Sequence, residues 1–338
     1  MQRNPILWLT LAVPCLIVGC ERDSGPARVA RAREIMGTFA TLTAIAPDET
    51  TAAAAVEAGY TRLQDVNRLM SDYISESEIG RLNRQPVDEP LSLSPETLHC
   101  LQRAIKVSQA SGGAFDVTCR PLVSLWKDAG RAGRLPSEEA LARVRSLIGA
   151  DKIALDVAAG TAARTAEGVQ VDLGGIAKGY ALDLAGEAMV NAGAASALVD
   201  VGGDVLAIGV NESGKPWRVG IKHPFRQAIF VILELSNRAV ATSGVQQRFH
   251  EIDGKRYSHI IDPRTGRPAE QAPSVTVIAA DGVTADAWAT VFSVLTIEEG
   301  RKLIAAGRAP KLEVMWIAGP ADEPLIEKTA GFDAYVVE

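Results

Sequence analysis

The most constraining stretch of this chain is the segment VDLGGIAKGY at positions 171–180. It joins an apolar strand end and an acid to two adjacent glycines and the start of a helix, so it predicts a tight turn whose backbone N–H groups can face an anion. The segment is neither of the two common phosphate loops. The triphosphate loop needs Lys after its second Gly, whereas Lys178 precedes Gly179, and the dinucleotide fingerprint needs a residue between its first two glycines, whereas Gly174 and Gly175 are adjacent. A purely structural turn with a solvated Lys178 is the alternative.

The N-terminus predicts export. Arg3 precedes an apolar run at positions 6–18 that is too short to span a bilayer and is typical of a signal-peptide core. A small residue then precedes Cys20, which is the order that lipoprotein processing requires. We therefore expect residues 1–19 to form a lipoprotein signal peptide and Cys20 to carry the lipid. The alternative is an ordinary signal peptide or anchor in which Cys20 has no role.

The rest of the chain predicts a tether followed by one large domain. Residues 20–33 combine Gly, Pro, small and charged residues without an apolar period, which is typical of a tether. Residues 34–338 suffice for a large core, in one domain of two coupled lobes. A net charge of −6 argues against nucleic acid as a partner. Cys100 and Cys119 lie outside the signal, and the sequence leaves open whether they form a disulfide. The absence of C-x-x-C and H-x-x-x-H spacings makes zinc unexpected.

Helical and strand patterns mix along the chain. Caps and apolar periodicity predict helices over 49–69, 94–111, 137–147, 176–192 and 282–296. Alternation predicts strands over 36–46, 197–201, 205–210, 217–221, 227–235, 239–242, 247–252, 256–261, 275–280, 312–317 and 334–337, with short strands around Gly160 and a short apolar segment over 121–126. Asp253-Gly254 predicts a hairpin turn. Because no regular β-α-β repeat occurs, the pattern favours an α+β fold.

Two segments carry side chains suited to chemistry. His259 lies on a short apolar strand that leads into a turn containing Asp262, and a His near a carboxylate suits general acid or base work. A half-buried strand histidine beside an ordinary Asp-Pro turn is the alternative. Asp286 and Thr290 are four residues apart on one helical face, where both can offer oxygens to Mg²⁺. The alternative is a solvated acid and a Thr bonded to its own helix.

Two further pairs are ambiguous. Phe115 beside Asp116 follows a helix-ending glycine pair, and an aromatic next to an acid can stack on and hydrogen-bond a flat ring. The same residues also suit a core position and a cap. Asp200 and Asp204 flank a Gly pair between two strands, where a tight hairpin is as good an explanation as a ligand contact.

The order of the motifs is more specific than any one of them. The chain contains M-G-T (36–38), S-D-Y (71–73), G-A-F-D-V-T (113–118), D-L-G-G-I-A-K-G-Y (172–180), D-V-G-G-D (200–204), S-H-I-I-D-P-R-T-G (258–266) and A-D-A-W-A-T (285–290). From about Ile35 to Leu295 this series resembles the ApbE family of FAD:protein FMN transferases. The resemblance implies an ApbE-like, T-fold-related α+β domain of mixed sheets with packed helices.

The resemblance also implies an activity. FMN would be transferred from FAD to a Thr or Ser hydroxyl of an acceptor protein, with Mg²⁺ required and AMP released. Typical acceptors are flavin subunits of membrane redox complexes, which agrees with lipid anchoring at the periplasmic face of a bacterial inner membrane. Hydrolysis of FAD to FMN and AMP, or binding of FAD without catalysis, would use the same motifs. The sequence leaves these alternatives open.

Site residues follow from the resemblance position by position. FAD contacts would come from Met36, Tyr73, Ala114, Phe115, Asp116, Gly174, Lys178, Tyr180 and Ile260. Mg²⁺ would be held by the main-chain oxygen of Ala177 and the side chains of Asp286 and Thr290. His259 would assist the attack by the acceptor hydroxyl, and Asp286 would be catalytic through the metal. Ala289 and Asp200 depart from the Ser and Asn common in the family.

Overall fold

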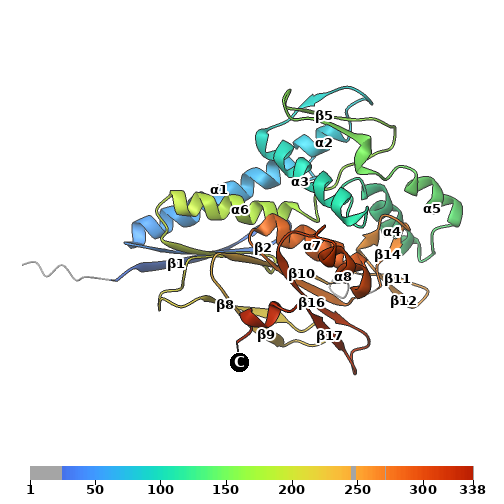
Figure 1. Cartoon of the computed structure of the whole chain (residues 1–338). Helices are drawn as coiled ribbons and strands as arrows, with labels where there is room; N and C mark the ends of the chain where they lie inside the picture. Colours follow the sequence, from blue (N-terminus) through green and yellow to red (C-terminus); the bar gives the residue numbers. More distant parts are fainter. Residues whose placement is uncertain (1–24, 245–248, 271, 338) are drawn as a thin grey trace, which may run out of the picture.

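The computed structural model describes residues 25–244, 249–270 and 272–337. The expected signal peptide and Cys20 lie outside these ranges. Within them, no helix combines the length and the apolar character needed to cross a membrane. Figure 1 shows a large central sheet with helices on one side, and a second, mostly helical lobe beyond them. The predicted α+β class is confirmed.

The central sheet has eight strands in the order β1-β2-β6-β7-β10-β15-β16-β17, and each neighbouring pair is antiparallel. The strands are β1 (Ala27–Ile35), β2 (Thr38–Ala46), β6 (Ser196–Val201), β7 (Asp204–Ile208), β10 (Arg238–Gly244), β15 (Ser274–Ala279), β16 (Leu312–Ala318) and β17 (Leu325–Lys328). The strands at the centre of this sheet begin and end within a few residues of the bounds predicted from the sequence alternation.

The first strand corrects the predicted tether. Residues 27–33, expected to belong to it, pair with β2 in a register that runs from Ala27–Ala46 to Ile35–Thr38. No apolar period marks this strand because it is the exposed edge of the sheet. Arg33 is held at 2.5 Å from the Glu57 carboxylate and stacks 4.3 Å above the Tyr60 ring. The backbone ladder and these side-chain contacts stabilise β1 in place of an apolar face.

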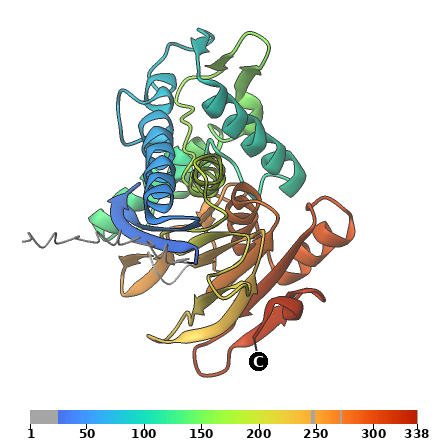
Figure 2. The ribbon, with the colours of Figure 1, turned by 90° about the vertical axis from the view of Figure 1, so that its left-hand side faces the viewer.

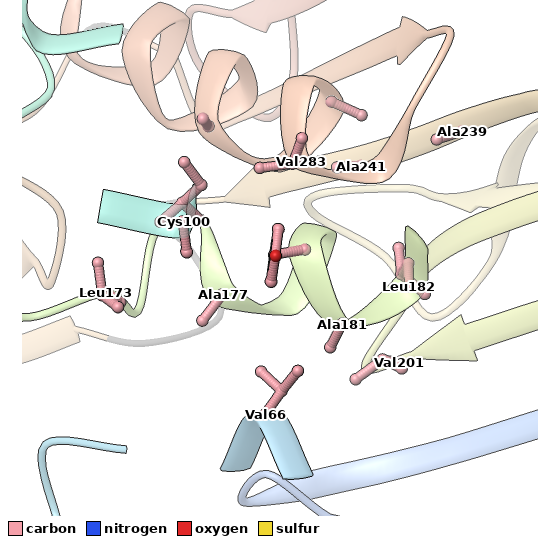
Figure 3. Close-up of a cluster of buried hydrophobic side chains, with 14 of the residues drawn as sticks. Val66, Cys100, Leu173, Ala177, Ala181, Leu182, Val201, Ala239, Ala241 and Val283 are labelled. Carbon is pink, nitrogen blue, oxygen red and sulfur yellow. The ribbon is translucent and has the colours of Figure 1, made fainter. Parts of the chain in front are cut away.

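Three helices cover one face of the sheet, namely α1 (Glu49–Met70), α6 (Ala177–Asn191) and α7 (Gly282–Val294). Figure 2 shows them stacked between the sheet and the second lobe. In Figure 3, Val66 of α1 points toward α6, while Ala177 and Ala181 point back toward α1. These side chains belong to one buried cluster, and their small size lets the helices lie close to each other and to the sheet.

The opposite face of the sheet is covered by a hairpin of β8 (Trp217–Lys222) and β9 (Ile229–Leu235). Its Trp217 and Leu233 pack with Val240 of β10 in a second buried cluster, whereas Ala239 and Ala241 of the same strand belong to the helix-facing core. The central strands are therefore buried on both faces. This explains why they are apolar almost throughout.

The second lobe holds α2 (Glu78–Leu82), α3 (Pro95–Ser111), α4 (Arg120–Ala132), α5 (Glu138–Arg145) and a small sheet of β3 (Leu91–Ser92), β4 (Ile153–Asp156) and β5 (Thr161–Arg164). Two small hairpins lie beside α4, β11 (Phe249–Ile252) with β12 (Lys255–Ser258) and β13 (Ile261–Asp262) with β14 (Arg267–Pro268).

Several local predictions were wrong or incomplete. The short apolar segment at 121–126 is part of the longer helix α4, and the expected final strand at 334–337 is instead the 3-10 turn Phe332–Tyr335. The helix α8 (Ile297–Ala305) was not predicted, although Thr296 and Glu299 form a capping box at its start. Cys100 and Cys119 are both free, so the open question of a disulfide between them is answered against it.

Candidate active site

A cleft of about 450 Å³ lies between the two lobes and the end of the helix layer. Segments far apart in the sequence line it, from the turn after β1 to the middle of α7. The predicted site residues that line it are Met36, Tyr73, Ala114, Phe115, Asp116, Gly174, Ala177, Lys178, His259, Ile260, Asp286 and Thr290. Every residue predicted for FAD binding, metal binding or catalysis, except Tyr180, therefore lines this one cleft.

The close approach of α6 and α7 brings the two sides of the cleft together. A Cβ atom on Gly179 would lie 2.1 Å from the Gly282 carbonyl oxygen and 2.7 Å from the Asp286 Cβ atom. Only glycine leaves room for this contact between backbones. The Gly179 N–H consequently donates to the Asp286 carboxylate over 2.9 Å. The turn that carries Ala177 and the helix that carries Asp286 are fixed against each other.

Asp183 supplies a second link between these helices. Its carboxylate accepts from the backbone N–H groups of Gly282 at 2.6 Å and Val283 at 2.9 Å, at the start of α7. Burial raises the pKa of Asp183 to about 6, because the loss of solvation outweighs the two N–H bonds, which lower it. Asp281 caps the same helix through the Thr284 N–H at 2.7 Å. The helix that presents Asp286 is therefore anchored at its first turn.

A buried charge cluster lies at the base of the cleft. Asp204 and Asp286 are each only 3% exposed, and the Lys178 ammonium forms ion pairs with both, at 3.4 Å from Asp286 Oδ1. The Thr242 N–H donates to the other oxygen of Asp204 over 3.2 Å. Two carboxylates in a dry site need such a cation, since an unpaired buried charge is strongly destabilising. Asp204 was only an ambiguous hairpin acid in the sequence, and its role here depends on the sheet.

The oxygen atoms of the cleft fit a hard cation. The Asp286 carboxylate and the hydroxyl of Thr290 line it together with Ala177. Carboxylate, hydroxyl and carbonyl oxygens are the donors Mg²⁺ prefers, and Mg²⁺ completes its shell with waters or phosphate oxygens. No cluster of three or more His, Cys, Asp and Glu side chains suited to a metal occurs among the described residues. A cation here would depend on main-chain and ligand oxygens as well.

The comparisons with known proteins agree with this geometry. The sequence model of the ApbE family matches residues 36–316. The chain belongs to the ApbE family. It is 33% identical to the FAD:protein FMN transferase of Vibrio cholerae, over 91% of this chain and 93% of that relative. It is 36% identical to the FAD:protein FMN transferase of Haemophilus influenzae, over 69% of this chain and 70% of that relative.

Solved structures give the same result. The flavin transferase ApbE from Vibrio cholerae superposes with a TM-score of 0.79 at 31% identity, covering 92% of this chain and 99% of that one. The ApbE protein of Thermotoga maritima superposes with a TM-score of 0.82 at 29% identity, covering 92% and 100%. The family that the motif order resembles is thereby confirmed, together with its fold.

Tyr180 is the ApbE-motif residue that the structure places elsewhere. It does not line the cleft but is buried on α6, with its hydroxyl 3.3 Å from His99 Nδ1 of α3. Burial raises its pKa to about 12. The Tyr180 ring contacts the ring of His99 on α3, with ring centroids 5.6 Å apart. The motif is continuous in sequence, but only its first part faces the ligand site.

Asp116 lines the cleft and also holds its own loop together. One carboxylate oxygen accepts from the N–H of Thr118 at 2.8 Å and from its hydroxyl at 2.6 Å, and the other accepts from the Ala150 N–H at 2.9 Å. The predicted cleft position is found, whereas Asp116 caps no helix, since Cys119 is the N-cap residue of α4 and has no side-chain cap bond. The neighbouring Phe115 ring supports the glycine turn, since a Cβ on Gly175 would lie 3.1 Å from it.

The His259 segment is positioned by a rigid turn. Asp262 accepts from the Arg264 backbone N–H at 2.9 Å and from its guanidinium, with a shortest distance of 2.9 Å. The Ile260 carbonyl, next to His259, accepts from the Ala269 N–H at 2.8 Å. Asp262 therefore shapes the turn, as the turn interpretation predicted, while His259 faces the cleft. The lining residues Asn67, Thr242 and Ser243 carried no signal in the sequence beyond their polar character.

Proposed function

We propose that this ApbE-family chain transfers the FMN part of FAD to a Thr or Ser hydroxyl of an acceptor protein, in an Mg²⁺-dependent reaction that releases AMP. That the chain is a transferase follows from its family, whose curated relatives carry the name FAD:protein FMN transferase. The observation that carries the finer proposal is the convergence of His259 and Lys178 with the oxygens of Ala177, Asp286 and Thr290 in one cleft.

The chemistry of the cleft suits a dinucleotide flavin. Phe115 and Tyr73 offer aromatic surface for a flat ring, and Tyr73, at 82% exposure, lies at the mouth. Arg120 forms an ion pair with Asp72 and lies 5.8 Å from the Tyr73 ring, which helps hold that ring in place. The Lys178 ammonium lies in the same cleft, where it is paired with Asp204 and Asp286. Mg²⁺, held by Ala177, Asp286 and Thr290, would neutralise negative charge on the phosphate oxygens.

In the proposed step, the acceptor hydroxyl oxygen attacks the phosphorus atom of the FMN half. A new oxygen–phosphorus bond forms, and the bond from that phosphorus to the bridging pyrophosphate oxygen breaks. His259 takes the hydroxyl proton, and AMP leaves with the former bridging oxygen. Phosphoryl transfer depends mainly on positioning and on neutralising charge, and the anchored helix pair would position the reacting groups.

The test is a transfer assay on the full chain. The protein is incubated with FAD, Mg²⁺ and a membrane redox subunit, and with the same subunit lacking its target hydroxyl. Flavin fluorescence on the acceptor band of a denaturing gel, lost in the hydroxyl-less subunit and in Asp286→Ala, supports the proposal. Free FMN and AMP without labelled acceptor would indicate a pyrophosphatase instead. Unchanged FAD would indicate a flavin-binding lipoprotein.

We further propose that the chain is lipid-anchored through Cys20 at the periplasmic face of the inner membrane, where membrane redox subunits are the acceptors. The support is the signal pattern together with the short distance to the domain. Residues 21–26 separate Cys20 from β1, so the tether reaches at most about 25 Å. Cys20→Ser should move the protein from the membrane fraction to the soluble periplasm. Unchanged membrane association would refute the anchor.

A further inference from the structure

A second hollow, of about 440 Å³, adjoins the cleft. It lies between the end of α5 and the turn that follows His259, and its lining includes Arg145, Ser146 and Arg264. Asp116 and Pro263 line both cavities, so the two are continuous around these residues. The hollow therefore opens directly onto the segment that presents His259.

Arg145 is held in this hollow by the turn itself. Its aliphatic stem packs on Gly266, where a Cβ atom would lie 2.8 Å from both Cγ and Cδ of Arg145. Its guanidinium donates to the Arg264 carbonyl over 2.7 Å. Two contacts thus orient a long side chain that would otherwise be mobile at the surface, and a pre-oriented guanidinium loses less entropy when it binds.

Within the described part of the chain, Arg145 differs from the nearby Arg264 and Arg267 in having no acidic partner. Arg264 pairs with Asp262 at 2.9 Å and with Glu299 at 3.3 Å, and Arg267 pairs with Glu138 at 2.5 Å. Among the residues that the structure describes, no carboxylate forms an ion pair with Arg145. Its guanidinium keeps free N–H donors in a planar fork that matches a carboxylate.

From these contacts we propose that the hollow is the docking groove for the acceptor polypeptide, and that Arg145 binds a carboxylate of an acidic segment beside the modified residue. This inference rests on the proposed transfer. FAD would fill the main cleft, so the acceptor must reach His259 from an adjoining surface, and this hollow is continuous with that segment. Recognition of an acidic chain would set the partner's chemistry and speed its encounter with the protein.

The experiment compares three variants of the full chain. Arg145→Glu reverses the charge, Arg145→Met removes it and keeps a stem that can pack on Gly266, and Arg143→Glu is the matched control. Arg143 lies on the same helix, is exposed and lines neither cavity. Steady-state transfer to the acceptor is measured at saturating FAD. The affinity for FAD is measured separately by flavin fluorescence, and folding by thermal unfolding.

Arg145→Glu should raise the KM for the acceptor about 10-fold or more, and Arg145→Met by a smaller factor, while the affinity for FAD stays within about twofold. Arg143→Glu should change neither. Added salt should weaken the wild type more than Arg145→Met. An unchanged acceptor KM in both Arg145 variants would overturn the proposal, and so would a loss of FAD affinity, which would assign the hollow to FAD phosphates. A wild type that labels no acceptor refutes the proposed function instead.

Discussion

The contact between α6 and α7 makes Gly179→Ala a sharp test of how the site is assembled. The new methyl group would lie 2.1 Å from the Gly282 carbonyl oxygen, 2.6 Å from its carbonyl carbon and 2.7 Å from Asp286 Cβ. All three are backbone or backbone-adjacent atoms, which cannot rotate away. Favourable contacts between heavy atoms lie near 3.5 Å, so α7 must move by about 1 Å.

Two magnitudes follow from that displacement. Overpacking costs about 1–3 kcal/mol, and the better helix propensity of Ala returns up to about 1 kcal/mol, so we expect the free energy of unfolding to fall by about 1–2 kcal/mol. The effect on activity should be larger. A shift of about 1 Å between Ala177 and Asp286 misaligns the proposed oxygen ligands, and displacements of that size cost about 100-fold in rate.

The matched control is Gly186→Ala on the same helix. Its methyl group would meet the terminal atoms Ile208 Cδ1 and Leu206 Cδ2, both at 2.7 Å, and these side chains can change rotamer. Urea unfolding and Mg²⁺-dependent flavin transfer are measured for both variants. We expect activity to fall in Gly179→Ala at Mg²⁺ concentrations that saturate Gly186→Ala. Wild-type activity and stability in Gly179→Ala would refute the claim that the two backbones must touch.

Three further substitutions test single residues. His259→Ala should slow transfer by about 10²–10⁴-fold with little change in FAD affinity; equal losses of rate and affinity would make His259 a binding residue. Burial raises the pKa of Asp183 from 3.8 to about 6, so the folded protein holds the Asp183 proton more tightly than the unfolded chain does. The contribution of this proton to the free energy of unfolding is therefore greatest below about pH 4 and falls as the pH rises to about 6. Asp183→Asn should remove this pH dependence, which amounts to about 3 kcal/mol in the free energy of unfolding from urea titrations between pH 4 and 7. Plots of that free energy against pH that run parallel for the wild type and the variant would contradict this prediction. Tyr180→Phe should leave FAD affinity within about twofold and cost at most about 1 kcal/mol of stability; a loss of affinity of about tenfold would return Tyr180 to the site.

The parts of the fold that the sequence predicted are those with local causes. The helix over 49–69 is found as Glu49–Met70, and the helix over 94–111 is found as Pro95–Ser111 with Ser94 as its N-cap. Such caps and periodicities act within a few residues, so they can be read without knowledge of the fold. The edge strand β1 was missed because its stability comes from pairing with β2 and from the ion pair of Arg33 with Glu57 on α1, which are tertiary contacts.

The sequence indicated most of the residues that meet in the cleft but not their arrangement. Motif order pointed to His259 and Asp286, yet neither residue indicates by itself that they share a cleft. Asp204 shows the limit most clearly. It begins β7 at the end of a Gly-Gly turn, and only the pairing of β7 with β10 and the reach of Lys178 from α6 make it a partner in the buried charge cluster. A carboxylate whose role depends on a lysine from another element has no local signature.

Gly179 and Gly282 have a local cost that only a tertiary contact explains. Read singly, Gly179 and Gly282 are glycines in the first turns of helices, where each weakens the helix by about 1 kcal/mol relative to Ala. Read together, each has a Cβ position that the other's backbone occupies, since a methyl on Gly282 would lie 2.5 Å from the Gly179 carbonyl oxygen. The cost in helix propensity is offset only if the helices touch. Because the same contact holds Ala177 beside Asp286, the glycine in A-K-G-Y serves the packing of the cleft, while the Gly174 N–H of the preceding turn donates to the Asp172 carboxylate over 2.7 Å.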